Sequence, residues 1–163
     1  MERLLGRYTE HIYAITRIVV AMVYWLHGMT KLFDWPPGAR PRGAVDVASL
    51  LGAAGVIETV CGALIMIGLL TRGAAFIASG QMAAAYFMRQ FPFAILPIYQ
   101  PPGILGESTI FNCFFFLYVA AKGPGIWSVD HVLAKRRGVT AAPADSQKYT
   151  TGTVLPRSPG PSV

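Results

Sequence analysis

Polar and ionisable side chains interrupt the apolar segments of this chain, where each would be costly to leave unpaired. These residues are Arg17, His27 and Lys31 in the first segment, Glu58 in the second, Gln81 and Arg89 in the third, and Glu107 in the fourth. An ionisable group in hydrocarbon costs roughly 2.5–3.5 kcal/mol on insertion scales. We therefore expect these side chains to face one another inside a bundle, where they form either a structural network or a functional site.

The segments that must position them run from about Ile12 to Phe33, Val45 to Leu70, Ala74 to Phe91 and Ile104 to Ala121. Each is near the length of about 20 residues that crosses a bilayer as a helix. The chain has 163 residues, of which 53% are hydrophobic and 13% charged, and its mean hydropathy is +0.46. These features predict an all-α membrane protein with four transmembrane helices in an antiparallel bundle.

The connections and the C-terminal region complete this prediction. The short turn from Gly68 to Gly73 predicts an antiparallel hairpin. After Ser128, apolar residues at helical spacing and a basic last turn predict a short interfacial helix. The membrane domain then covers residues 1–137, and the small and polar residues of 138–163 predict a disordered tail.

The net charge of +6 at pH 7 does not by itself indicate a nucleic-acid-binding protein, because most of the basic residues flank the apolar segments. They are more numerous on the side of the termini, so the positive-inside rule predicts that both termini are cytoplasmic. The lipid bilayer is the expected partner, and no nucleic acid is expected.

Two groupings follow from helical spacing and depth. Tyr24, His27 and Lys31 share a face of the first helix, and His27, Lys31, Arg89 and Glu107 should lie near the non-cytoplasmic mouth. We also predict a buried ion pair between Arg17 and Glu58.

Each grouping has a simpler alternative. The ion pair can be purely structural, Lys31 and Arg89 can extend to the interface, and the helix dipole can stabilise Glu107. Gln81 is expected to form hydrogen bonds between helices. Phe111 and Phe114 are either cofactor walls or lipid-facing residues.

Haem and metal sites are not predicted. His11 and His131 lie at the opposite end of the bundle from His27, and bis-histidine haem needs two facing histidines. Cys61 and Cys113 form no CxxC motif. The imidazole of His27 remains notable, because histidine can change charge near neutral pH.

Several of these residues fall in motifs that resemble the DoxX family of small bacterial membrane proteins. The motifs are Arg17 with His27-Gly28-x-x-Lys31-Leu32-Phe33, Gly55-x-x-Glu58-x-x-x-Gly62, Gly68-x-x-Thr71-Arg72, Gly106-Glu107 and Gly123-Pro124-Gly125-x-x-Ser128-x-Asp130. The resemblance covers about Ile15 to Asp130. It implies a four-helix bundle in the bacterial cytoplasmic (inner) membrane and an association with redox chemistry, but membership alone does not establish an enzyme.

The leading hypothesis is a subunit that supports quinone-linked redox chemistry in a larger oxidoreductase or oxidative-stress complex, with protein partners or as a homo-oligomer. Quinone is the expected cofactor. Its site would be lined by His27, Lys31, Glu107, Tyr24, Phe111 and Phe114. The alternatives are a non-enzymatic membrane anchor or assembly subunit with a structural polar network, and a small transporter.

Overall fold

The computed structural model describes residues 2–37, 43–89 and 106–136, and these form helices without a strand. The helices are α1 (Glu2–Phe33), α2 (Leu50–Ile67), α3 (Thr71–Arg89), α4 (Gly106–Lys122) and α5 (Val129–Arg136). The all-helical prediction is confirmed. The predicted disordered tail and the connection between the third and fourth segments lie outside the described residues.

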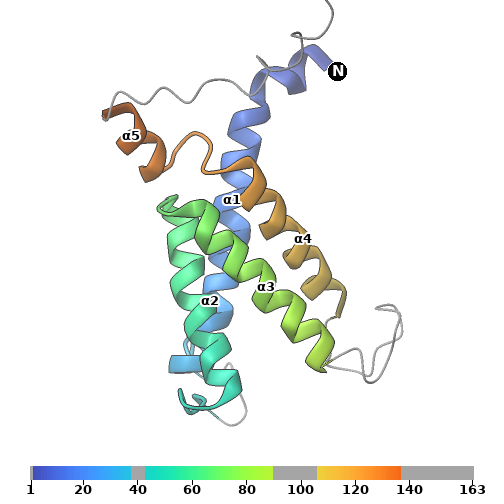
Figure 1. Cartoon of the computed structure of the whole chain (residues 1–163), viewed down its shortest axis with the longest axis vertical. Coiled ribbons are helices and arrows are strands. Elements are labelled where there is room, and N and C mark those ends of the chain that lie inside the picture. The colour runs from blue at the N-terminus through green and yellow to red at the C-terminus, as the bar shows by residue number, and fades with distance from the viewer. Residues whose placement is uncertain (1, 38–42, 90–105, 137–163) are drawn as a thin grey trace, which may run out of the picture.

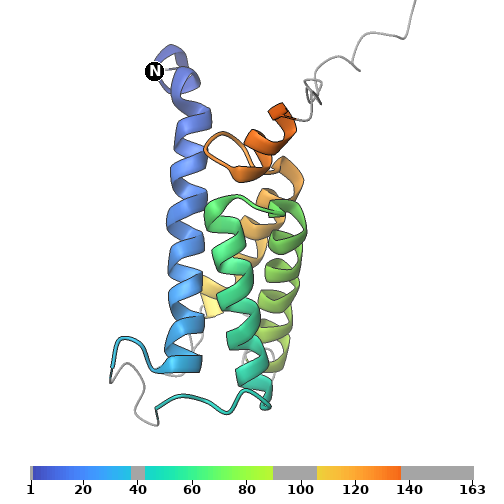
Figure 2. The same ribbon diagram turned by 90° about the vertical axis from the view of Figure 1, so that its left-hand side faces the viewer.

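Figures 1 and 2 show α1 to α4 as an antiparallel bundle with α5 across one end. The most extensive contacts are those of α1 with α2 and of α3 with α4, and α2 also contacts α3, to which the predicted hairpin joins it. α1 extends well past the α2–α3 turn, and α5 lies beside that turn (Figure 2). The end of the bundle that carries α5 is called the α5 end below.

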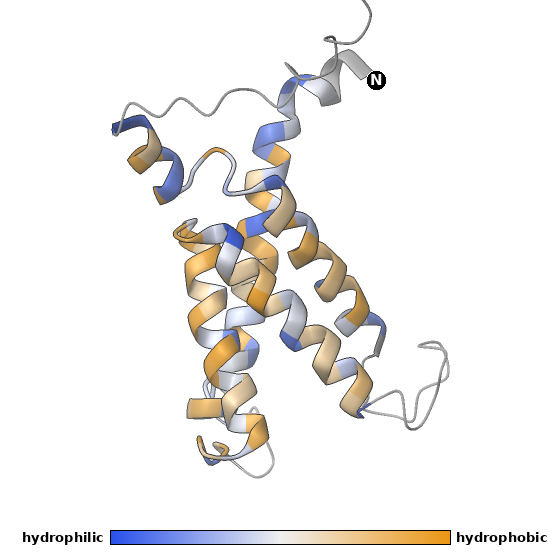
Figure 3. Ribbon diagram, in the orientation of Figure 1, coloured by the Kyte–Doolittle hydropathy of each residue, from blue (hydrophilic) through white to orange (hydrophobic). Residues whose placement is uncertain are grey.

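Two stretches of the described chain, Gly6–Phe33 in α1 and Leu50–Ile67 in α2, are long and apolar enough to cross a membrane. α3 and α4 have 19 and 17 residues. Figure 3 shows apolar residues along most of α2 and α4 and hydrophilic residues gathered near α5. Two membrane-crossing helices are therefore supported, and four remain a prediction.

Glycine allows α1 and α2 to pack at very short range. A Cβ atom on Gly28 would lie 2.6 Å from the backbone nitrogen of Thr59 and 2.8 Å from the carbonyl oxygen of Gly55. A Cβ atom on Gly62 would lie 2.9 Å from the Cα atom of Trp25. Small residues at such positions let membrane helices approach closely. These contacts also fix the register, with Glu58 level with Gly28.

The α2–α3 turn is closed by Gly68, which has φ 74° and ψ 40° at the C-cap of α2. This left-handed conformation suits glycine, and a Cβ atom here would also collide with Ser128. At the other end of α2, the hydroxyl oxygen of Ser49 accepts a hydrogen bond from Gly52 N at 3.0 Å. Helix α2 therefore has a defined start and a defined stop.

Candidate functional site

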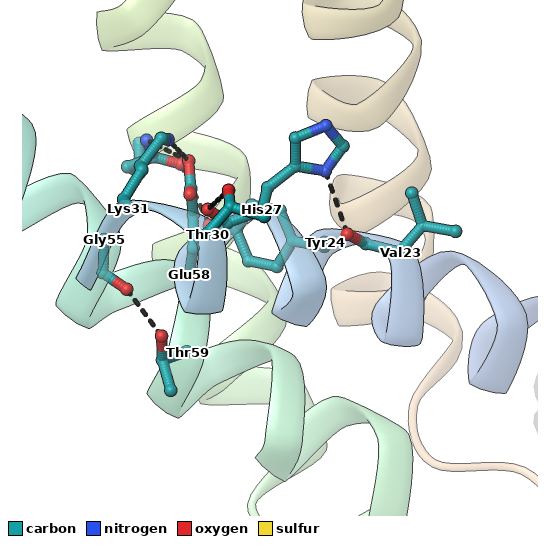
Figure 4. Close-up of polar contacts among 9 residues, drawn as sticks. Val23, Tyr24, His27, Thr30, Lys31, Gly55, Glu58 and Thr59 are labelled. Atoms are coloured by element: carbon teal, nitrogen blue, oxygen red, sulfur yellow. Dashed lines mark hydrogen bonds and ion pairs between the residues drawn. The ribbon is translucent and has the colours of Figure 1, made fainter. Parts of the chain in front are cut away.

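A buried polar network joins three helices of the bundle. Lys31 of α1 donates a hydrogen bond to Glu58 Oε1 of α2 and forms an ion pair with it (Figure 4). Gln81 Nε2 of α3 lies 3.4 Å from the same oxygen and donates to it. Tyr24 OH of α1 donates to Gln81 Oε1 at 2.9 Å. We call Tyr24, Lys31, Glu58 and Gln81 the Glu58 network, and the predicted interhelical role of Gln81 is confirmed.

Glu58 lies at the centre of this network and has unused bonding capacity. The residue is 2% exposed, whereas the side chain of Lys31 is 19% exposed. Among the described residues, nothing forms a hydrogen bond with the buried Oε2 atom of Glu58. A carboxylate has about four acceptor sites on its two oxygens. The arrangement can therefore hold a proton on Oε2 or accept a hydrogen bond there from a bound molecule.

The predicted Arg17–Glu58 ion pair is wrong. Arg17 is fully buried, and its guanidinium donates to the carbonyl oxygens of Pro124 and Trp127, the latter at 2.8 Å. The reason is depth: Arg17 lies eleven residues before Gly28, about 16 Å along a helix. Lys31 is one turn from Gly28 and reaches Glu58 instead.

Arg17 belongs to a second polar cluster at the α5 end. The carboxylate of Asp130 accepts hydrogen bonds from Leu70 N, Thr71 N and Thr71 Oγ1, each at 3.0 Å. In return, Asp130 N donates to Gly68 O at 2.9 Å. We call this set of contacts, together with those of Arg17, the clasp. It fastens the loop before α5, and the start of α5 itself, to α1 and to the α2–α3 turn.

Tyr13 and Arg72 reinforce the α5 end from the sides. Tyr13 OH donates to Gly123 O at 2.5 Å. The guanidinium of Arg72 donates to Ala120 O and Ala121 O at 3.3 and 3.1 Å, which are carbonyls of the last turn of α4. Such carbonyls lack partners within their own helix. The motifs around Thr71-Arg72 and Gly123–Asp130 thus have a structural role.

The structure does not gather the predicted mouth cluster. His27 is exposed on α1, its Nδ1 atom donates to Val23 O at 2.9 Å, and its ring points away from Glu58 (Figure 4). Glu107 is exposed at the start of α4, and Phe111 and Phe114 are 74% and 65% exposed. Of the predicted quinone-site residues, only Tyr24 and Lys31 come together in the Glu58 network.

Sequence reasoning assigned no role to Tyr13 or to the Asp130 carboxylate. A signal for Asp130 was present, since it stands two residues after the helix-capping Ser128 in a Gly-rich motif. What was missing was its partner, the start of α3, which lies about 60 residues away in sequence and can be placed only by the bundle's topology.

The fold and the buried network define a helical membrane protein with polar groups held between its helices. The DoxX family sequence model matches residues 12–90. An uncharacterized protein of Haemophilus influenzae is 37% identical over 133 residues, covering 81% of this chain and 98% of that protein. An uncharacterized membrane protein of Mycobacterium tuberculosis is 32% identical, covering 74% of this chain and 80% of that protein.

The chain therefore belongs to the DoxX family of membrane proteins. The resemblance that the sequence motifs indicated is confirmed. No solved structure matches the chain.

Proposed function

We propose that this protein is a subunit of a quinone-linked redox complex in the bacterial inner membrane, with both termini cytoplasmic, and that the Glu58 network handles the protons. The observation that supports this most directly is the buried Glu58 carboxylate, paired with Lys31 on one oxygen and without a described hydrogen-bond partner on the other.

Energetics favour a functional reason for the network. Burying an ion pair removes two charges from water, and well-packed apolar residues are often as stabilising as such a pair. Ionisable groups retained inside a membrane therefore tend to mark proton, ion or substrate sites. Tyr24 and Gln81 extend the network into the bundle, while the partly exposed Lys31 links it toward the surface.

In the proposed quinone reduction, the chain itself would have to provide only hydrogen-bond donors and a route for protons. Reduction of a quinone to a quinol takes up two electrons and two protons, and a partner subunit with a redox cofactor would supply the electrons. Lys31 and Gln81 offer N–H donors to a quinone oxygen. The Glu58 carboxylate, ionised in its pair with Lys31, would first take up a proton by way of the partly exposed Lys31 side chain and would then pass that proton on. The apolar tail of the quinone would remain in lipid.

The test is a quinone-binding titration on protein purified in mild detergent, with mass-spectrometric identification of copurified proteins and extracted quinone. Lys31→Met and Glu58→Gln should weaken binding about tenfold or more, as expected for a lost charged hydrogen bond. Glu107→Gln is the matched control, because Glu107 is exposed on α4. Absence of binding by the parent protein, or equal affinity in all variants, would refute the proposal.

A membrane anchor or assembly subunit is the second candidate, and the clasp favours it. Thr71 and Asp130 bond to each other and to the backbone, and two guanidinium nitrogens of Arg17 donate to backbone carbonyl oxygens, as structural residues do, although Arg17 Nε has no described hydrogen-bond partner. The exposed Phe111 and Phe114 would then contact lipid or a partner helix. On this view the Glu58 network only holds three helices together, and a folded Glu58→Gln variant would still assemble with its partners.

A further inference from the structure

Helix α5 has an apolar face that the described part of the chain leaves uncovered. Val129, Val132 and Leu133 lie on one side of the helix, and their exposed fractions are 40%, 52% and 38%. Asp130, on another side, points to the α2–α3 turn and fixes how α5 is rotated. The clasp thus holds this short helix with its apolar face outward.

Aromatic rings continue this surface onto α1. Trp127 is 58% exposed and directly precedes the N-cap residue of α5. Its ring meets that of His11 edge-on, with centroids 5.5 Å apart, and the His11 ring meets that of Tyr8 at 6.4 Å. Tryptophan and tyrosine are enriched where a bilayer meets water. These three rings are therefore of the kind found at the depth of the lipid headgroups.

The last turn of α5 adds positive charge. Lys135 and Arg136 are exposed there, and neither takes part in the two ion pairs found among the described residues. The nearby carboxylates are already engaged, Glu10 with Lys122 and Asp130 with the start of α3. A negatively charged surface is the complementary partner.

We infer that α5 and Trp127 form a docking surface for anionic phospholipid, with the apolar face in the acyl boundary and Lys135 and Arg136 on the phosphates. Amphipathic helices of this kind lie in the interface plane and bind more tightly to anionic lipid. The clasp holds α5 beside the end of α2, one of the helices able to cross a membrane, which places it at the right depth. The lipid contact is independent of any quinone chemistry.

The test places Trp127 in the full chain as the only tryptophan, with Trp25 and Trp35 replaced by phenylalanine. The protein is reconstituted into phosphatidylcholine vesicles with increasing phosphatidylglycerol, and fluorescence quenching is measured with brominated lipids and with aqueous iodide. We expect lipids brominated near the headgroup to quench the Trp127 fluorescence, and we expect this quenching to increase with the fraction of phosphatidylglycerol. Free glycerol phosphate added to the solution should not change this quenching, because the proposed ligand is the lipid and not its headgroup alone.

The charge variant Lys135→Gln/Arg136→Gln should lower the apparent affinity for phosphatidylglycerol by about 25-fold, since each of the two basic residues contributes roughly fivefold at an anionic surface. Arg89→Gln, at the opposite end of the bundle, should leave the response unchanged. If the Trp127-only protein does not fold, native mass spectrometry replaces the quenching measurement. It compares how much phosphatidylglycerol is retained by the native chain and by the charge variants made in that chain. Quenching by iodide alone, protection from both quenchers, or equal responses in neutral and anionic vesicles would overturn the inference.

Discussion

The Lys31–Glu58 pair can be tested against the Arg17–Glu58 pair with the same glutamate substitution. Two double-mutant cycles share Glu58→Gln, one combined with Lys31→Met and the other with Arg17→Gln. In the structure, Glu58 contacts Lys31, whereas Arg17 is bound to the carbonyl oxygens of Pro124 and Trp127. The two cycles therefore measure whether the contribution of Lys31 or that of Arg17 to stability depends on the charge of Glu58.

The magnitudes follow from burial and distance. Removing one partner of a buried ion pair costs about 3–5 kcal/mol. Lys31→Met should approach this range, because it leaves an unpaired negative charge on Glu58, which is only 2% exposed. Glu58→Gln should cost less, because the Lys31 side chain is 19% exposed and can turn outward. The double variant leaves no unpaired charge, so the coupling should be about 1–3 kcal/mol. Arg17 lies about 16 Å from the level of Glu58, so its cycle should be additive within about 0.5 kcal/mol.

The assay is unfolding in mixed micelles with increasing sodium dodecyl sulfate, followed by circular dichroism. Arg17→Gln should itself be strongly destabilising, since it removes hydrogen bonds that hold the loop before α5. The two pairings are distinguished by the coupling energies and not by the single losses. Coupling to Arg17 with additivity at Lys31 would refute the register of α1 against α2 that places Lys31 beside Glu58.

Two further predictions concern packing and the clasp. Gly28→Ala should destabilise the bundle by about 1–3 kcal/mol through overpacking against α2. Gly80→Ala, where a Cβ atom meets nothing within 4 Å, should be neutral or stabilising by up to about 1 kcal/mol. Thermal melts in detergent compare the two variants, and equal losses of stability would contradict the close contact at Gly28. Asp130→Asn should cost about 1–2 kcal/mol of stability by weakening the cap on α3, and Asp46→Asn, in an exposed turn, should cost less. Hydrogen exchange at the start of α3 should rise only in the Asp130 variant. Unchanged protection there would count against the clasp.

Much of the architecture could be predicted because apolar length and breaking residues are local signals. The hairpin at Gly68, the short helix after Ser128 and the membership of the DoxX family all follow from patterns within one segment or from motif order. The face that carries Tyr24 and Lys31 was likewise predicted from helical spacing. These features need no knowledge of how far one helix slides along another.

The candidate site could be predicted only in part, because it depends on that sliding. The predicted ion pair with Arg17 assumed that the second helix starts near Val45 and that this start is level with Phe33, which puts Arg17 and Glu58 about one turn apart in depth. In the structure α2 begins at Leu50, so Glu58 is only about two turns from the start of α2, and the contact of Gly28 with Gly55 and Thr59 leaves Arg17 level with Gly68. Likewise, spacing groups Glu107, Phe111 and Phe114 on one face of α4 but does not say that this face is exposed.

The motif glycines explain why Lys31, and not Arg17, meets Glu58. Gly28 and Gly62 lie where α1 and α2 are in close backbone contact, and any side chain there would push the helices apart or shift them along each other. Lys31 is three residues after Gly28, and Glu58 is four residues before Gly62, so each lies one turn from a contact point. The spacing within each motif therefore couples a packing residue to a charged one. A substitution that shifts the register should separate the charges even when both remain in the sequence.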